Sequence, residues 1–248
     1  TRYWRDWSSD VCSSDLRVPY GGKSRETVER YSIEIGNLLL GGGAKMIVVA
    51  CNTASALGVP RMKQVFEVPV VGVVLPGAKA AVDSTKNKTI GVIGTRATIA
   101  SGAYEEAILK LEPAAKIHST ACPLLVPLIE EGLFEDSVTD QMLRRYLEPL
   151  LAKGIDTLVL GCTHYPMVER LIRRNVPADA VLISSGEEIA REIADTLRRQ
   201  GMLREGGEGT YRFACSGDPA AFRTIGSRFL QMPFGDVEQV DPGVAAAG

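Results

Sequence analysis

The chain has 248 residues, of which 45% are hydrophobic and 23% charged, and its formal net charge is −2. This length and composition are typical of a globular protein with one large or two small domains. Lysine and arginine are scattered, which argues against a nucleic-acid-binding surface, and no apolar run reaches the roughly 18 residues of a membrane span. The five cysteines form no C-x-x-C pair, so free thiols and a cytoplasmic location are expected.

The first sixteen residues, TRYWRDWSSDVCSSDL, differ from the rest of the chain. They contain both tryptophans, Trp4 and Trp7, and are rich in serine and aspartate. They have neither a helical nor a strand period. We therefore predict that residues 1–16 are a foreign or disordered segment, such as a fusion scar.

From Arg17 onward, helical and strand patterns alternate. Ser24 is placed to cap a helix with an apolar face at Val28, Tyr31, Ile35, Leu38 and Leu39, ending at the glycines 41–43. Strands are then expected at 45–50, 70–74, 89–94, 115–119, 156–161, 180–184 and 210–216. Helices are expected between them, at about 77–85, 101–111, 138–152, 166–174, 187–200 and 218–230, with a short one interrupted near Pro60. This alternation predicts an α/β fold with parallel sheets, whose ligand sites lie at the carboxyl ends of the strands.

Two strand ends carry the same local pattern. In IVVACNT and LVLGCTH, an apolar strand and a small residue precede a cysteine and two polar residues. The cysteines, Cys51 and Cys162, are 111 positions apart, which indicates a duplicated α/β unit. The small residues Ala50 and Gly161 allow another backbone or a ligand to come close. The polar residues lie where amide groups at a helix start can hold a carboxylate.

Three kinds of chemistry use two facing thiols. A disulfide has no support in the local sequence. A metal needs more ligands than two thiols and one histidine, so another part of the chain would have to supply a further ligand. The third is two-sided proton transfer at a carbon, in which one thiolate removes a proton and the other thiol delivers one to the opposite face. Helix-start amides and His164 are expected to lower the thiol pKa from about 8.5.

Other polar residues have simpler interpretations. Cys122 and Cys215 are expected to be buried structural thiols, and His118 is expected to be structural. The stretch GVIGTRAT lacks a complete G-x-G-x-x-G motif, so a dinucleotide site is not favoured. A carboxylate-binding or plain turn role for Gly94 and Thr95 is preferred.

The segments RVPYGGKS, VVACNTASA, GVIGTRATIASGAYEEAI, ACPLLVPLIEEG and DTLVLGCTHYP resemble the bacterial glutamate racemases, within the aspartate/glutamate racemase superfamily. The resemblance extends from about Arg17 to Val240. It implies an isomerase that needs neither pyridoxal phosphate nor another cofactor or metal and interconverts L- and D-glutamate. D-glutamate would serve peptidoglycan biosynthesis, and so the cell wall and cell shape. No nucleic-acid or membrane partner is implied, and a homodimer is compatible with the family.

The resemblance also implies two pseudo-symmetric α/β domains with the active site in the cleft between them. We expect residues 17–75 plus 190–248 to form the first domain, without its first βαβ segment, and residues 76–189 to form the second. By motif, Cys51 and Cys162 match the two acid/base residues, serving the D- and L-enantiomer respectively. His164 and Glu130 match residues that assist proton transfer. The residues that match substrate-binding positions are Tyr20, Gly21, Asn52, Thr53, Thr163 and His164.

One departure from the family pattern affects the expected activity. The motif Asp-Ser-Gly-Val-Gly-Gly, whose aspartate assists the first cysteine, is absent from the sequence. An impaired or inactive enzyme is therefore expected. The alternatives are a racemase of aspartate or another amino acid, a non-catalytic ligand-binding fragment, and a metal-binding or redox protein that uses the same thiols.

Overall fold

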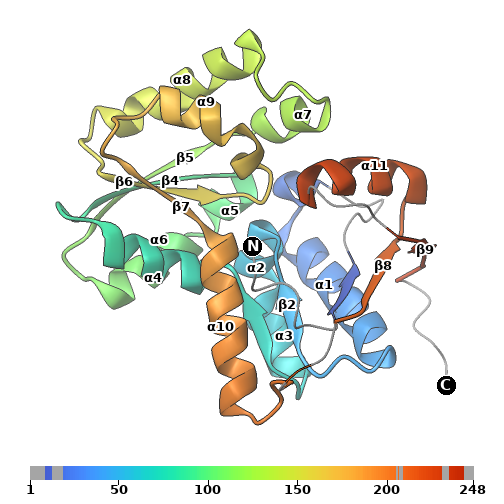
Figure 1. The fold of residues 1–248 in the computed structure, drawn as a ribbon. Coiled ribbons are helices and arrows are strands. Elements are labelled where there is room, and N and C mark those ends of the chain that lie inside the picture. The colour runs from blue at the N-terminus through green and yellow to red at the C-terminus, as the bar shows by residue number, and fades with distance from the viewer. Residues whose placement is uncertain (1–8, 13–18, 205, 207–208, 231–234, 243–248) are drawn as a thin grey trace.

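The computed structural model describes residues 9–12, 19–204, 206, 209–230 and 235–242. In these ranges the strands form three parallel sheets, with the orders β5-β4-β6-β7, β2-β3 and β1-β8-β9. Helices cover the sheets, so the predicted α/β class with parallel sheets is confirmed (Figure 1).

The largest sheet holds the core of the molecule. It consists of β4 (Thr89–Gly94), β5 (Lys116–Ala121), β6 (Thr157–Gly161) and β7 (Val181–Ser184). Every residue of β4 and β6 is buried, as the continuous apolar runs predict. Gly94 pairs with Gly161, so the two central strands end at the same level.

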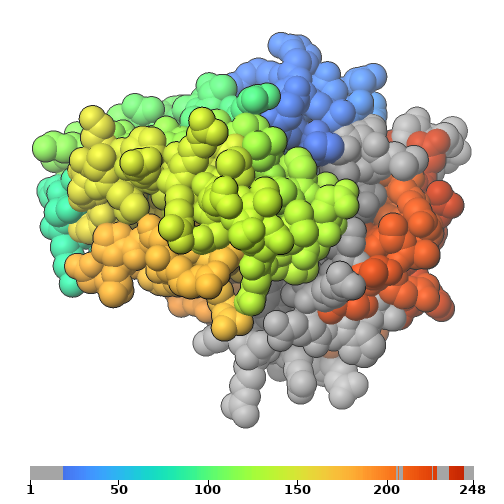
Figure 2. All heavy atoms as spheres, turned by 90° about the horizontal axis from the view of Figure 1, so that it is seen from above, coloured from blue at the N-terminus to red at the C-terminus, as the bar shows by residue number. Residues whose placement is uncertain are grey.

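Helices cover both faces of this sheet. On one face, α4 (Val74–Ser84) and α6 (Ala103–Leu111) pack against apolar residues of β4, β6 and β7. On the other lie α7 (Leu125–Glu130), α8 (Ser137–Leu151) and α9 (Glu169–Arg174), which together with β6 form a second apolar cluster. In Figure 2 the yellow-green to yellow part of the chain, which includes α7 to α9, occupies the left and middle of the face seen from above.

Two smaller sheets complete the described chain. Strands β2 (Ile47–Val49) and β3 (Val70–Gly72) pack against α1 (Arg25–Gly41) and α3 (Val59–Val65). The long helix α10 (Ser185–Arg199) packs on Val73, beside these strands. Strands β1 (Ser9–Cys12), β8 (Tyr211–Cys215) and β9 (Val237–Gln239) form the third sheet, and α11 (Pro219–Leu230) connects β8 to β9. The largest sheet lies wholly within residues 76–189, and the two-domain division remains a prediction.

Helix α1 begins where predicted but buries a different face. Ser24 caps it by accepting a hydrogen bond from the Thr27 amide, and the helix ends at Gly41, before Gly43 with its positive φ of 86°. Its buried residues are Val28, Ser32 and Gly36, whereas the other predicted apolar positions are only half-buried. Small side chains are buried here because α3 lies close: a Cβ on Gly36 would overlap the Phe66 ring.

Several local features differ from the expectations. Residues 1–16 are predicted to be a foreign or disordered segment, but Ser9–Cys12 pairs as β1 with β8 and is not disordered. The rest of that segment lies outside the described residues, and its foreign origin remains a prediction. The sequence patterns also did not predict α5 (Arg96–Ala100), α7, β9 or the 3-10 turn Tyr20–Gly22. These elements have three to six residues, too few for a periodic pattern to stand out.

Candidate active site

Cys51 lies between β2 and the short helix α2 (Asn52–Leu57), of which it is the N-cap residue. Burial raises the pKa of its thiol, and hydrogen bonds from the amides of Ala54 and Thr53 and from the Thr53 hydroxyl only partly oppose this effect. The side chain packs with a cluster that includes Tyr20 and Leu57. Burial therefore favours the protonated thiol at Cys51.

Cys162 directly follows β6, and the next helical turn, Tyr165–Val168, begins after His164. Its Sγ lies 3.7 Å from Nδ1 of His164. Burial raises the pKa of its thiol to about 12, the amide of His164 opposes this rise, and negative charge on Cys51 and Glu130 adds to it. The expectation that helix-start amides and His164 lower the thiol pKa is therefore wrong in its net direction. Local sequence suggests the amides, but the larger effect comes from tertiary burial.

The two thiols are close enough to interact electrostatically, since a charge on Cys51 raises the pKa of Cys162. The interaction joins residues from two different sheets. The strand pattern predicts that the turns holding Cys51 and Cys162 lie close together.

Gly161 shows why a small residue precedes the second cysteine. A Cβ at this position would lie 2.7 Å from the carbonyl oxygen of Ile93 on β4 and 3.3 Å from the Tyr104 ring. The predicted close approach of another backbone is therefore confirmed. Glycine at this position allows β6 to lie this close to β4, directly before Cys162.

His164 links Cys162 to Glu130. Its Nε2 lies 3.3 Å from Glu130 Oε1, while Nδ1 faces the thiol. With the ring proton on Nε2, directed to the carboxylate, Nδ1 is free to accept a proton from the thiol. Glu130 is the last residue of α7, so a helix absent from the sequence-based prediction brings it to the site.

The polar residues after Cys51 join a network that reaches the larger sheet. The hydroxyl oxygens of Thr53, Thr95 and Thr98 form a triangle with sides of 2.9, 3.0 and 3.0 Å. Thr95 caps α5 at the end of β4 and accepts a hydrogen bond from the Thr98 amide. The Tyr104 hydroxyl donates to Asn52 Oδ1 at 2.6 Å.

The remaining predicted residues lie around this network. Tyr20 is buried, and a Cβ on Gly21 would lie 2.6 Å from Thr95 Cβ, so the 3-10 turn packs directly on the start of α5. Thr163 is half-buried beside Cys162. Sequence reasoning missed Thr98 and Tyr104. Thr98 had one usable signal, because Thr95 and Thr98 stand three residues apart at a helix start.

Cys122 also follows a strand, β5, and Cys215 is the last residue of β8. Cys122 and Cys215 are buried in apolar clusters, as expected. Cys12 lies outside the residues whose side chains are described. In the described part of the chain, no group of three or more His, Cys, Asp or Glu side chains is arranged to hold a metal ion, and no helix there is long and apolar enough to cross a membrane.

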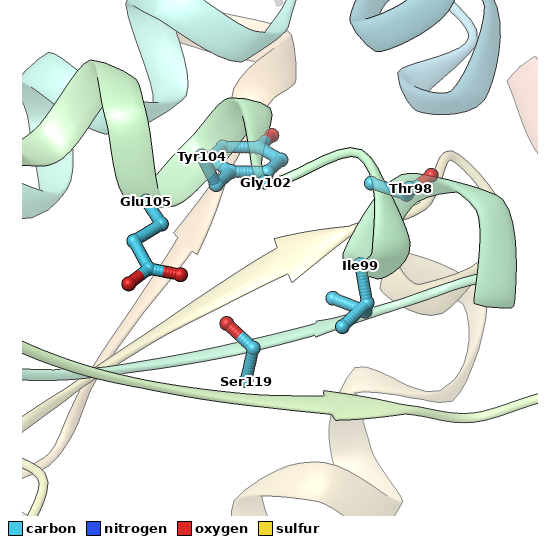
Figure 3. A pocket seen from close by; sticks show the side chains of 6 residues that line it. All are labelled: Thr98, Ile99, Gly102, Tyr104, Glu105 and Ser119. Carbon is cyan, nitrogen blue, oxygen red and sulfur yellow. The ribbon is translucent and has the colours of Figure 1, made fainter.

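A pocket of about 120 Å³ lies beside this network, lined by Thr98, Ile99, Gly102, Tyr104, Glu105 and Ser119. Figure 3 shows the Tyr104 hydroxyl at the end of its ring away from Glu105. Neither cysteine lines the pocket, so it is distinct from the thiol pair.

Comparison with known proteins identifies the family of the chain. The family model for Asp/Glu/Hydantoin racemase matches residues 9–193. The chain belongs to this racemase family. It is 47% identical over 225 residues to a glutamate racemase of Geobacter metallireducens, covering 90% of this chain and 83% of that protein. It is 44% identical over 229 residues to a glutamate racemase of Neisseria gonorrhoeae, covering 92% of this chain and 84% of the relative.

Solved structures show the same fold. Glutamate racemase isoform RacE1 from Bacillus anthracis superposes with a TM-score of 0.91 at 38% identity, covering 95% of this chain and 88% of the other. The glutamate racemase of Francisella tularensis, solved in complex with D-glutamate, gives a TM-score of 0.85 at 32% identity, covering 91% and 84%. The predicted family and enzyme class, an isomerase of the glutamate racemase type, are therefore confirmed.

Proposed function

We propose that this chain interconverts L- and D-glutamate by two-base proton transfer between Cys51 and Cys162, supplying D-glutamate for peptidoglycan. The observation that carries the proposal is that Cys51 and Cys162 follow strands of two different sheets and that Tyr104 contacts both turns, through Asn52 and Gly161. The complex of the Francisella tularensis relative with D-glutamate supports the substrate.

In the proposed reaction, one thiolate takes the Cα proton, so the C–H bond breaks and an S–H bond forms. The electron pair remains on the substrate carbon. The opposite thiol then gives its proton to the other face, so its S–H bond breaks and the new C–H bond inverts the stereocentre. Cys51 serves the D-enantiomer and Cys162 the L-enantiomer.

The raised thiol pKa values make substrate binding part of the activation. In the ligand-free chain burial favours neutral thiols at both positions. A substrate ammonium group between them favours the thiolate, because an opposite charge stabilises the ionised form. His164, paired with Glu130, accepts the Cys162 proton on Nδ1 and returns it.

Substrate contacts are proposed for Tyr20, Gly21, Asn52, Thr53, Thr163 and His164. Thr53 and Asn52 adjoin Cys51, and Thr163 and His164 adjoin Cys162, so the groups that bind substrate are attached to the groups that move protons. This coupling matters because positioning supplies a large part of a rate enhancement.

The test is circular dichroism of purified chain with L- or D-glutamate, without pyridoxal phosphate or added metal. The circular dichroism signal should decay from either enantiomer, and in D₂O deuterium should be incorporated at Cα. Cys51→Ser and Cys162→Ser should abolish interconversion, whereas Cys215→Ala, at a buried thiol outside the site, should retain it. Full activity in either serine variant contradicts the two-base assignment.

Two features of the proposal need their own measurements. The Asp-Ser-Gly motif is absent from the 248 residues, so we expect a lower rate than that of the Geobacter metallireducens relative, assayed side by side. Equal rates would show that this motif is not needed here. Aspartate in the same assay distinguishes an aspartate racemase, and titration calorimetry with glutamate identifies a chain that binds without turnover.

A further inference from the structure

Tyr104 touches the turns of both cysteines. It is the second residue of α6 and only 3% exposed. Its hydroxyl donates a 2.6 Å hydrogen bond to Asn52, the residue after Cys51. Its ring lies against Gly161, the residue before Cys162, where an added Cβ would be 3.3 Å away. One side chain therefore connects two turns that are far apart in the sequence.

The Asn52 amide is held in a defined orientation by this contact. Asn52 is 2% exposed, and its Oδ1 accepts the Tyr104 hydrogen bond. Its Nδ2 is buried and has no hydrogen-bond partner in the described part of the chain. Buried N–H groups without partners are rare and costly in folded proteins. An amide held by its oxygen presents its NH₂ group, with two N–H donors, on the other side.

The hydroxyl of Tyr104 can act only as a neutral group at physiological pH. Burial, and then the charge of Cys162, raises the pKa of Tyr104 well above its ordinary value. The hydroxyl therefore stays protonated and donates a hydrogen bond to Oδ1 of Asn52. If the amide were reversed, Oδ1 would face the ligand and repel a carboxylate.

We propose that Tyr104 is a positioning residue, whose hydroxyl orients the Asn52 amide so that its NH₂ group binds a substrate carboxylate. The contact of the Tyr104 ring with Gly161 fixes the position of this NH₂ group relative to the Cys162 turn. The inference rests on the proposed glutamate function for the ligand, whereas the orientation of the amide does not depend on it.

The ligand test is a double-mutant cycle on D-glutamate affinity, measured by calorimetry in the full chain. Tyr104→Phe should weaken binding about five- to tenfold, roughly the contribution of one neutral hydrogen bond. In an Asn52→Ala background the same change should have no further effect, because its partner is gone. Tyr165→Phe is the matched control: Tyr165 is fully buried and its hydroxyl bonds the Cys122 carbonyl at 3.4 Å. It should bind as the unchanged chain does.

The second readout needs no ligand. The side-chain amide resonances of Asn52 in a ¹⁵N-correlated NMR spectrum should shift and broaden in Tyr104→Phe and remain unchanged in Tyr165→Phe. Unchanged Asn52 resonances, or additive effects in the cycle, would overturn the role of Tyr104. Absence of any glutamate binding by the unchanged chain would instead contradict the proposed function and leave the NMR outcome to decide the orientation.

Discussion

The raised pKa of Cys162 leads to a quantitative prediction about its reactivity. Burial, opposed by the His164 amide and increased by the charges of Cys51 and Glu130, moves this pKa from 9.0 to about 12. Only the thiolate is nucleophilic. At pH 8 a thiol with a pKa of 9.0 is roughly 10% ionised, but a thiol with a pKa of about 12 is ionised to roughly 0.01%. Ionisation alone should therefore slow alkylation of Cys162 about a thousandfold.

The pH dependence separates this effect from poor access. Restricted access multiplies the rate by a factor that is constant with pH, whereas the pKa sets the pH at which the rate stops rising. We expect the iodoacetamide rate at Cys162 to rise about tenfold per pH unit from about pH 7 to 10, without a plateau. The assay is quenched alkylation, digestion and mass spectrometry, with circular dichroism to verify folding at each pH. A plateau below about pH 9 would refute the argument from burial.

One substitution tests the electrostatic part of the same argument. Glu130→Gln removes a negative charge that raises the pKa of Cys162, so alkylation at fixed pH should become about two- to threefold faster. Glu131→Gln, at the adjacent exposed position after α7, is the matched control and should leave the rate unchanged. Slower alkylation in Glu130→Gln would contradict the sign of this interaction.

Three further predictions concern the scaffold of the site, and each is measured by urea unfolding. Gly161→Ala should cost about 1–3 kcal/mol, because its Cβ would lie 2.7 Å from the Ile93 oxygen, whereas Gly41→Ala, with open space at Cβ, should not destabilise. Asp156→Asn should lower the free energy of unfolding by about 2–4 kcal/mol. The Asp156 carboxylate accepts hydrogen bonds from the hydroxyls of Thr85 and Thr157 and from the amides of Lys86 and Asn87, and in asparagine an NH₂ group takes the place of one accepting oxygen. Burial raises the pKa of Asp156, but these hydrogen bonds have the larger combined effect, and the pKa is lowered overall. The stabilisation by Asp156 is therefore present above about pH 3.8 and should be lost as the pH falls through the lowered pKa. Ser24→Ala should lower the free energy of unfolding by about 1 kcal/mol because the α1 cap is lost, whereas Ser24→Asp should change it little. Equal stability of the unchanged chain and both variants would show that the cap contributes nothing.

The local parts of the site could be read from the sequence. The apolar runs before Cys51 and Cys162 predict strands, and both cysteines do follow strands. Ser24 caps its helix, and Gly161 meets a neighbouring backbone, as their residue types predict. Each of these inferences depends on a few adjacent residues, whose conformational preferences act over one turn or one strand.

The parts that were missed depend on contacts between distant segments. The Thr53–Thr95–Thr98 triangle joins residues more than 40 positions apart, and the Tyr104–Asn52 bond spans 52. Periodicity carries no information on such pairs, because it reports only which face of an element is apolar. The apolar face of α1 was misjudged for the same reason, since the close approach of Phe66 favours Gly36 over larger residues.

The sequence by itself determined the α/β class, the two cysteine turns and the residue types attached to them, because strand formation and capping are local properties of the chain. The tertiary structure alone decided the direction of the thiol pKa shifts, the pairing of His164 with Glu130 and the orientation of the Asn52 amide. Desolvation of a thiol depends on every segment that packs around it, and those segments come together only when the chain folds.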